Sequence, residues 1–287
     1  MDNVVCYDLH SDILTAKRDF KGLIKESVNN QKQGYKSINA IFKGDLLWKN
    51  VLDIARKAKQ NLLDIAFEDC CYTDFKQEVY GKDFCQEKLL ALASELEQLK
   101  PLYLSLCWNG KNEFAYGCKE QGGLTEWGKR FIEILNEKNL VLDTAHANEE
   151  SFYQIVERAN KVICSHAAFS FIYPHKRNVS KHQIKQILQK GGIIGIVAVG
   201  HFLTGAKGSI SAYENAFYEH IDGYLQNFGD RGLCIATDFY GSDAPVFFDG
   251  DYSFCDRFRD RLMQNGVTSG AIDNILFKNA NAFFAQK

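Results

Sequence analysis

Short apolar segments recur along the whole chain and alternate with longer segments that are rich in charge. The apolar segments are hydrophobic at successive positions, which is typical of strands buried on both faces in a parallel sheet. There are eight, at residues 4–8, 37–42, 62–67, 102–107, 140–144, 162–165, 193–197 and 233–237. The pattern therefore predicts eight buried parallel β-strands.

The segments between the predicted strands carry helical periodicity. It is clearest at residues 49–60, 126–137, 150–159 and 181–190. Strands that alternate with helices indicate an α/β fold with a parallel sheet. Eight such units in 287 residues match a closed (β/α)8 barrel, the TIM barrel. The chain has only three prolines and no low-complexity linker, so we predict one domain over residues 1–287.

An open, doubly wound sheet is the alternative architecture. It would require a glycine-rich phosphate or dinucleotide loop after the first strand. The residues that follow Tyr7 read DLHSD and contain no glycine. The sequence therefore favours the closed barrel.

Polar residues at the strand ends are the candidate chemistry, because active sites of such barrels lie at the carboxyl ends of the strands. The fourth segment is followed by Trp108, and the second and seventh offer no obvious ligand. The others are followed by histidine or acidic residues, namely His10, Asp12, Glu68, His146, His166 and Asp238.

The spacing of these residues predicts a metal centre. On an extended chain His10 and Asp12 point the same way, so that one metal can bind both. His146 and His166 follow successive strands and can share a second metal, with Glu68 as a bridge. Nitrogen and oxygen ligands without thiolates suit Zn²⁺, with Mn²⁺ or Co²⁺ as alternatives. Two metals would hold a bridging hydroxide and polarise a carbonyl group.

Each candidate also has an ordinary interpretation. A single histidine at a strand end is usually a hydrogen-bonded structural residue, and segment 8–12 could be a helix N-cap cluster. Glu68 could begin a helix near its positive end. The joint position of the set favours the metal centre. The remaining histidines lie in loop-like or helix-like surroundings and are interpreted as structural: His175, His182, His201 and His220.

Several motifs resemble those of the renal (membrane) dipeptidase family, the M19 metallopeptidases of the amidohydrolase type. Residues 104–112 (LSLCWNGKN) are similar to the family's L-T-L-T-H-N-x-x-N, and residues 237–241 (TDFYG) to S-D-F-D-G. Further similar motifs, in the family's order, are GLTEWG at 123–128, DTAH at 143–146, SH at 165–166, RN at 177–178 and GGIIG at 191–195. The resemblance runs from about residue 4 to residue 245.

The resemblance implies a zinc-dependent dipeptidase on a TIM barrel, which cleaves a dipeptide or a small N-acyl amino acid by attack of a metal-bridging hydroxide. His10 and Asp12 would bind one metal, and the other ligands would be those described above. Arg177 would hold a substrate carboxylate through two parallel hydrogen bonds. Asp238 would take a proton from the attacking water and pass it to the leaving amine. An ordinary surface ion pair is the alternative for Arg177.

The chain departs from the family at three places. Trp108 stands where the family has a histidine that binds the scissile carbonyl oxygen. An indole offers one N–H and no positive charge, which predicts a loss of ~100-fold or more in rate, or a different substrate. The segment from Glu68 to Trp108 is longer than in the family, and Tyr240 and Lys181 replace common aspartates. Two alternatives follow: hydrolysis of a non-peptide amide or lactone, and a metal-binding barrel without catalysis.

Composition and charge bear on the expected partners and cellular location of the protein. The net charge is −2, there is no basic stripe with interleaved aromatics, and no apolar stretch is long enough to cross a membrane. We therefore expect no nucleic-acid or membrane partner, and the N-terminus lacks a signal-peptide pattern, which favours a cytoplasmic protein. A homodimer is compatible with the resemblance.

Cysteine usage fits the same context. The nine cysteines have no regular spacing and are interpreted as reduced thiols. A zinc knuckle or disulfide cluster of Cys70, Cys71, Cys85 and Cys118 is the alternative, and its spacing fits no standard template.

Overall fold

The computed structural model describes residues 4–16, 19–71, 85–206 and 208–285. Its strands are hydrogen-bonded in sequence order and the sheet closes on itself. They are β1 (Cys6–Ser11), β2 (Tyr35–Phe42), β3 (Ile65–Glu68), β4 (Leu104–Ser105), β5 (Leu142–Asp143), β6 (Val162–Ala167), β7 (Ile194–Val197) and β8 (Leu233–Ala236). The closed parallel barrel is confirmed, and the alternative of an open sheet is wrong.

Helices follow most of the strands. They are α1 (Phe20–Lys32), α2 (Trp48–Gln60), α3 (Gln86–Leu99), α4 (Glu126–Glu137), α5 (Glu149–Arg158), α6 (Lys181–Gln189), α7 (Gly200–Leu203), α8 (Ile210–Phe228), α9 (Phe254–Gln264), α10 (Ser269–Asp273) and α11 (Asn279–Phe284). A 3-10 turn, η1 (Ile13–Thr15), follows β1, and a π-helical turn, η2 (Asn274–Lys278), joins α10 to α11. The four helices expected at residues 49–60, 126–137, 150–159 and 181–190 are all present.

The chain divides into two compact units. We call residues 1–39 with 164–287 the terminal unit, and residues 40–163 the middle unit. Each unit is described by itself, and the single-domain organisation stays a prediction.

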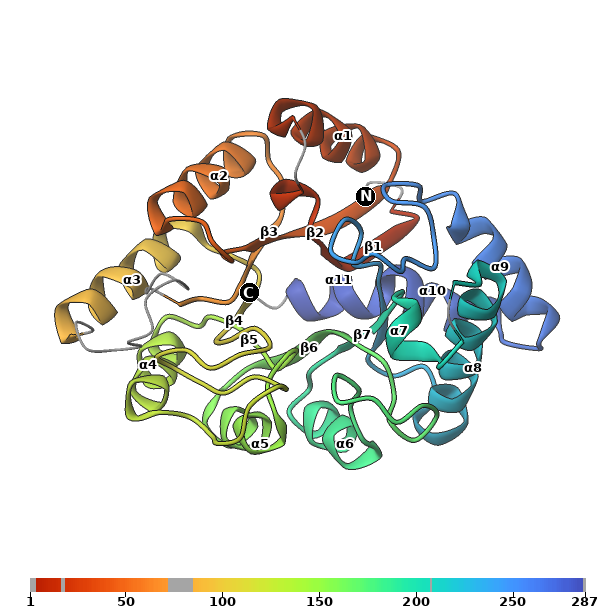
Figure 1. Ribbon diagram of the computed structural model, residues 1–287. Coiled ribbons are helices and arrows are strands. Elements are labelled where there is room, and N and C mark those ends of the chain that lie inside the picture. Colours follow the sequence, from red (N-terminus) through yellow and green to blue (C-terminus); the bar gives the residue numbers. More distant parts are fainter. Residues whose placement is uncertain (1–3, 17–18, 72–84, 207, 286–287) are drawn as a thin grey trace. The chain divides into compact units, whose positions relative to one another are not determined.

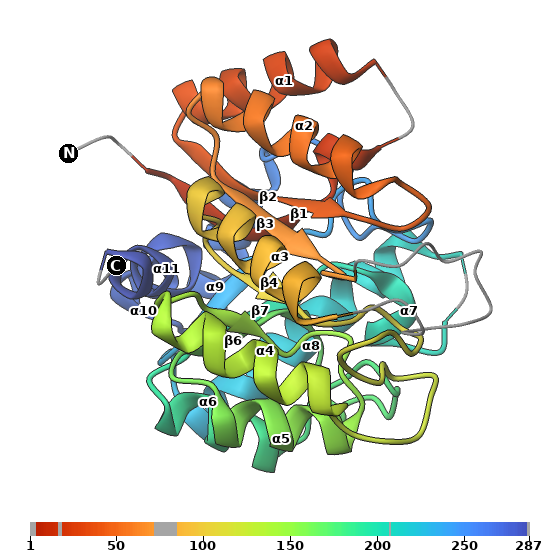
Figure 2. The same cartoon turned by 90° about the vertical axis from the view of Figure 1, so that its left-hand side faces the viewer.

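In the middle unit, helices α2 to α5 lie on the outer side of strands β3 to β5 (Figures 1 and 2). Helix α4 begins at Thr125, whose side chain accepts a hydrogen bond from the backbone N–H of Gly128. The helix buries Phe131, which stacks on Phe114 with ring centroids 4.6 Å apart. This packing anchors the loop that carries Trp108, because Phe114 belongs to the same connection between β4 and α4.

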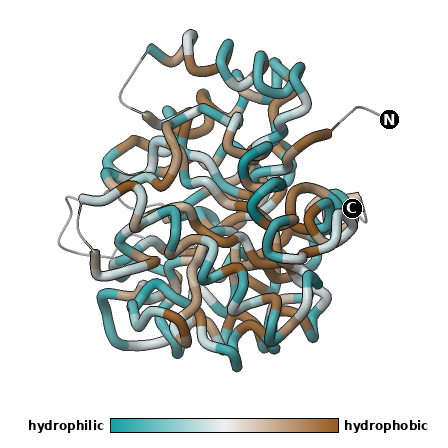
Figure 3. Tube along the Cα trace, turned by 90° about the vertical axis from the view of Figure 1, so that its right-hand side faces the viewer, coloured by the Kyte–Doolittle hydropathy of each residue, from teal (hydrophilic) through white to brown (hydrophobic). Residues whose placement is uncertain are grey.

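In the terminal unit, β8 pairs with β7 over four residues and with β1 through Asp8 and Ile235. Hydrophobic and hydrophilic residues alternate along its helices (Figure 3), as expected of helices that bury one face. The buried aromatic cluster of Phe217, Phe247, Phe254 and Phe258 packs α8 and α9 against the loop that follows β8. That loop begins with the candidate residue Asp238.

Two other sequence-based expectations can be compared with the structure. All nine cysteines are free thiols, and the groups of potential metal ligands found among the described residues contain no cysteine. Within the described part of the chain no helix combines the length and apolar character needed to cross a membrane. The cytoplasmic location stays a prediction.

Candidate metal centre

The terminal unit brings His10, Asp12 and Asp238 together. The Nε2 atom of His10 lies 3.7 Å from Oδ1 of Asp12 and 3.8 Å from Oδ1 of Asp238. One ligand atom from each side chain lies within 4.8 Å of the others. The imidazole nitrogen of His10 and the carboxylate of Asp12 can hold a divalent cation, and the carboxylate of Asp238 stands beside them. The expectation that His10 and Asp12 point the same way agrees with these distances.

Backbone hydrogen bonds between the ends of β1 and β8 fix this cluster. The N–H of Asp238 donates to the carbonyl of His10 at 2.9 Å, and the N–H of Asp12 donates to the carbonyl of Phe239 at 2.8 Å. They hold Asp238 at a φ of 54°, in the left-handed region that is uncommon for residues other than glycine. Strained backbone of this kind is often found at functional sites.

Gly241 provides the space that the two carboxylates occupy. A Cβ atom at this position would lie 2.2 Å from Oδ2 of Asp12 and 2.3 Å from Oδ1 of Asp238. The N–H of Gly241 donates to the carbonyl of Asp238 at 3.0 Å, which closes a tight turn below the site. The carboxylates therefore keep their positions only because residue 241 has no side chain.

The pKa shifts of the buried side chains in the cluster are compatible with a bound cation. Burial raises the pKa of Asp238 to about 7, and a nearby Arg177 opposes this shift. Burial, then the charge of Asp238, raises the pKa of Asp12 well above its usual range, and Oδ1 of Asp12 has no hydrogen-bond partner among the described residues. Burial, then the charge of Arg177, lowers the pKa of His10 to about 3, which favours the neutral ring. A metal ion fits this set of buried nitrogen and carboxylate donors.

A further buried carboxylate, that of Asp8, supports the cluster through hydrogen bonds. It accepts hydrogen bonds from the N–H of His10 at 3.1 Å and from the N–H and hydroxyl of Thr237 at 2.9 and 2.6 Å. The hydroxyl of Tyr252 donates to it at 2.7 Å. Asp8 thus ties the residue before Asp238 to the backbone of a candidate ligand.

His166 lies next to His10, and Arg177 contacts the backbone of His166. The ring of His166 lies 3.9 Å from that of His10, and its Nδ1 is 2.8 Å from Oγ of Ser165. A hydrogen bond at Nδ1 orients the ring of a histidine that binds a metal through its other nitrogen. His10 and His166 belong to β1 and β6 rather than following them, because both strands extend beyond the apolar segments.

Arg177 is only 6% exposed, which argues against the alternative of a surface ion pair. Its guanidinium lies over the ring of Phe202 at 5.5 Å, and Nη2 donates to the carbonyl of His166 at 3.5 Å. Its Nε is buried without a hydrogen-bond partner among the described residues. A buried cation with an unused donor suits the binding of an anionic group.

The middle unit brings Glu68 and His146 together. Oε1 of Glu68 lies 2.7 Å from Nε2 of His146, and both side chains are buried. Nδ1 of His146 lies 2.9 Å from Oδ1 of Asn109, which also accepts a hydrogen bond from Cys118 at 3.1 Å. An amide oxygen at Nδ1 favours the tautomer with its proton there, which leaves the Nε2 lone pair facing a carboxylate. Two acceptors at this distance require a shared proton or a cation between them.

His146 has a φ of 69° and therefore shares with Asp238 a left-handed backbone at the candidate site. Trp108 is half-buried beside it. The Trp108 ring lies 6.0 Å from that of His146 and 5.1 Å from that of Phe42. An aromatic wall next to a candidate ligand thus occupies the position where the resemblance leads one to expect a polar donor.

The structure groups the predicted site residues into two sets. His10, Asp12, His166, Arg177 and Asp238 belong to the terminal unit, and Glu68, Trp108 and His146 belong to the middle unit. The sharing of two metals between these sets, with Glu68 as the bridge, stays a prediction. The part of the Glu68–Trp108 segment at residues 72–84 lies outside the described residues.

Three supporting residues were not singled out in the sequence. Asn109 and Gly241 lie inside the motifs that carry the resemblance, and that position was the available signal. Asp8 lay in the segment whose ordinary interpretation was an N-cap cluster. Its role depends on partners 229 and 244 residues away, so no local pattern could reveal it.

Comparison with known families and proteins identifies the family of the chain. The model of a family described as membrane dipeptidase (peptidase family M19) matches residues 84–286. An uncharacterised protein in the pqqA 5′ region of Klebsiella pneumoniae is 26% identical over 183 residues, which cover 60% of this chain and 67% of that protein. Dipeptidase 3 of Rattus norvegicus is 26% identical over 165 residues, 57% of this chain but only 33% of the rat protein.

Solved structures show the same fold. A dipeptidase described as an M19 metallopeptidase has a TM-score of 0.77 at 16% identity, with 98% of each chain covered. A metallopeptidase from Rhodobacter sphaeroides, liganded with a phosphinate mimic of the dipeptide L-Ala-D-Ala, has a TM-score of 0.73 at 15% identity, with 99% of each chain covered. An amidohydrolase from Pseudomonas aeruginosa has a TM-score of 0.71 at 17% identity and covers 99% of this chain and 96% of that one.

Proposed function

Because this chain belongs to the membrane dipeptidase family, peptidase family M19, and is a metal-dependent hydrolase, we propose that it cleaves the amide bond of a dipeptide or a similarly small N-acyl amino acid. The observation that carries this proposal is the buried cluster of His10, Asp12 and Asp238 around Gly241, with a buried Arg177 close enough to shift the pKa values of two of its members. The similar Rhodobacter structure, with its bound dipeptide mimic, supports a substrate of this size.

We propose zinc as the metal, with two ions per chain and with Mn²⁺ or Co²⁺ as alternatives. The ligands would be His10 and Asp12 for one ion and His146 and His166 for the other, with Glu68 shared. Parallel strands of a barrel end at the same mouth, which supports ligands drawn from β1, β3, β5 and β6. When bound, such metals supply a water of lowered pKa and polarise the carbonyl group of the substrate.

The chain's own groups perform the remaining tasks. Asp238 takes the proton of the attacking water and delivers it to the leaving amine, and its carboxylate lies 3.8 Å from the ring nitrogen of the proposed ligand His10. Arg177 holds the substrate carboxylate, because Nε of its buried guanidinium has no hydrogen-bond partner among the described residues. Together they align the scissile bond with the cluster.

A second candidate function rests on Trp108. The half-buried indole beside His146 cannot supply the positive charge of a histidine, and it offers an apolar face to the substrate. This favours hydrolysis of a non-peptide amide or a lactone as the alternative. A barrel that binds metal without turnover is the third outcome of the experiment below.

The test is hydrolysis of dipeptides, N-acyl amino acids and lactones by protein purified without chelator. The proposal predicts turnover of a dipeptide or N-acyl amino acid that falls by ~100-fold or more in Asp238→Asn while the metal remains bound. Asp256→Asn, at an exposed aspartate of α9 in the same unit, should match the natural chain. Turnover confined to lactones or non-peptide amides would move the assignment to the alternative, and bound metal without any turnover would contradict hydrolysis.

A further inference from the structure

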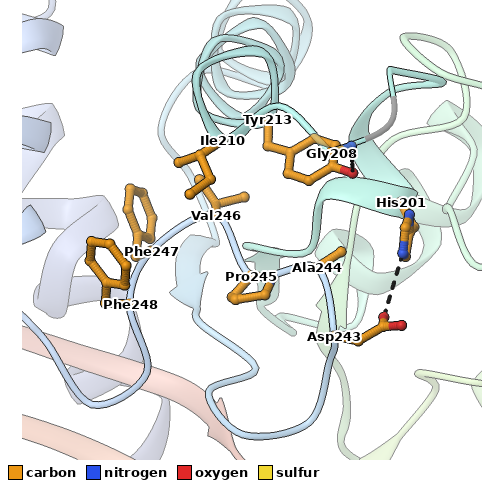
Figure 4. A pocket seen from close by; sticks show the side chains of 10 residues that line it. All are labelled: His201, Gly208, Ile210, Tyr213, Asp243, Ala244, Pro245, Val246, Phe247 and Phe248. Carbon is orange, nitrogen blue, oxygen red and sulfur yellow. Dashed lines mark hydrogen bonds and ion pairs between the residues drawn. The ribbon is translucent and has the colours of Figure 1, made fainter.

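The terminal unit contains a cavity of about 420 Å³ between α7, the start of α8 and the loop that follows β8 (Figure 4). This volume lies within the ~300–1,000 Å³ of pockets that bind small molecules. The cavity has an apolar half and a polar end. Its lining includes His201, Ile210, Asp243, Ala244, Val246 and Phe248.

The two halves of the cavity differ in chemistry. At the polar end, Nε2 of His201 lies 3.4 Å from Oδ1 of Asp243, and the two side chains point toward one another (Figure 4). At the apolar end, Phe248 and Ile210 are 75% and 55% exposed, which is unusual for side chains of this size. The cavity therefore offers apolar surface that remains in contact with water.

Backbone hydrogen bonds place this cavity at the carboxyl ends of β7 and β8. The N–H of Val246 donates to the carbonyl of Ala198 at 2.9 Å, and the N–H of Gly200 donates to that of Ala244 at 2.8 Å. The wall of the cavity is thus a continuation of the two strands at the end where Asp238 lies.

Two connections along the chain place the polar end of the cavity near the cluster. Asp243 is two residues after Gly241, so their Cα atoms are at most ~7.6 Å apart, and a Cβ atom on Gly241 would lie 2.2 Å from Oδ2 of Asp12 and 2.3 Å from Oδ1 of Asp238. His201 directly precedes Phe202, and the guanidinium of Arg177 lies over the Phe202 ring. A substrate carboxylate held by Arg177 would therefore lie close to the polar end of the cavity.

We propose that this cavity receives the apolar side chain of the carboxyl-terminal residue of the substrate. This inference rests on the proposed function, and it adds the class of substrate: a dipeptide or N-acyl amino acid that ends in a leucine-like or phenylalanine-like residue. The carboxylate of that residue binds Arg177, and its side chain passes the His201–Asp243 pair and covers Ile210 and Phe248. An apolar substrate side chain that covers Ile210 and Phe248 removes their apolar surface from water, and this favours substrates with a large apolar carboxyl-terminal residue.

The test compares glycylglycine, glycyl-leucine and leucyl-glycine as substrates of the metal-loaded protein. Replacing Ile210 and Phe248 together by alanine should raise KM for glycyl-leucine by ~10-fold, with kcat, glycylglycine and leucyl-glycine unchanged. Both side chains are largely exposed, so the variant should fold. Met263→Ala removes a side chain that is 53% exposed on α9 and does not line the cavity, and it should change nothing.

Each outcome bears on a separate claim. A selective rise in KM for glycyl-leucine supports the subsite. An equal change for all three dipeptides, a change for leucyl-glycine alone, or no change overturns the subsite and leaves the dipeptidase assignment intact. Absence of hydrolysis of every dipeptide by the natural chain overturns the proposed function, and the subsite with it.

Discussion

At the residue scale, Gly241 shows how a missing side chain shapes the site. A Cβ atom at this position would collide with the carboxylates of Asp12 and Asp238, so both must move in Gly241→Ala. A displacement of about 1 Å in a catalytic group can lower a rate by ~100-fold, and we predict a loss of that size in kcat/KM together with weaker metal binding. Gly270→Ala is the control, because a Cβ there meets no atom within 4 Å. Full activity of Gly241→Ala would show that the carboxylates are not functional where they stand.

Tyr252 provides a milder test of the support below the cluster. Tyr252→Phe removes the hydroxyl that donates to Asp8 at 2.7 Å and leaves the ring in place. Because hydrogen bonds to charged groups contribute ~1.5–3 kcal/mol, the free energy of unfolding should fall by about that amount. Urea denaturation measures the change. An unchanged midpoint would mean that the other donors to Asp8 satisfy it alone.

The cluster of His10, Asp12 and Asp238 could be predicted from the sequence, whereas the hydrogen bonds that support it could not. His10, Asp12 and Asp238 were identified because each stands at the end of an apolar segment, and barrel geometry makes such ends converge. Asp8 acts through hydrogen bonds to Thr237 and Tyr252, which follow more than 200 residues later. Contacts of this range leave no local pattern.

At the element scale, the presence of each strand was easier to predict than the residues at which it begins and ends. Every expected apolar segment contains a strand, because burial on both faces produces an apolar run. β1 continues through the polar residues His10 and Ser11, whereas β4 and β5 are only two residues long. Hydrogen bonding to neighbouring strands sets these limits. The π-helical turn at Asn274–Lys278 likewise has no signal in the hydrophobic pattern.

Helix α8 contains a histidine whose titration should be visible in stability. His220 accepts a hydrogen bond at Nδ1 from the N–H of Phe169 at 3.1 Å, and its Nε2 lies 3.1 Å from the carbonyl of Leu203. These contacts suit a neutral ring, and burial lowers the pKa of His220 from 6.5 to about 4. The interpretation of His220 as structural agrees with these contacts.

The sign of the pH effect follows from this shift. Between pH 6.5 and about 4 the unfolded chain binds a proton at His220 that the folded chain does not, so stability is lost as the pH falls. We predict that His220 adds ~1.4 kcal/mol per pH unit to the slope in this range, and that His220→Gln removes that contribution. Urea denaturation of both proteins at several pH values measures the difference. Equal slopes would contradict a neutral buried ring.

At the scale of the whole molecule, the barrel topology could be predicted and the division into two compact units could not. Eight alternating strand and helix segments define the topology, but no linker or change in composition marks the boundaries near residues 39 and 163. The family match at residues 84–286 spans parts of both units. The ligands that we propose belong to residues of both units, so the proposal is tested on the complete chain.

Metal content per chain tests the central claim most directly. Elemental analysis of protein purified without chelator should find about two equivalents of zinc. His146→Ala and His166→Ala should lose metal and hydrolysis together, while Asp256→Asn keeps both. A chain that binds no metal, even after zinc is added back, would contradict the metal-dependent hydrolase that we describe.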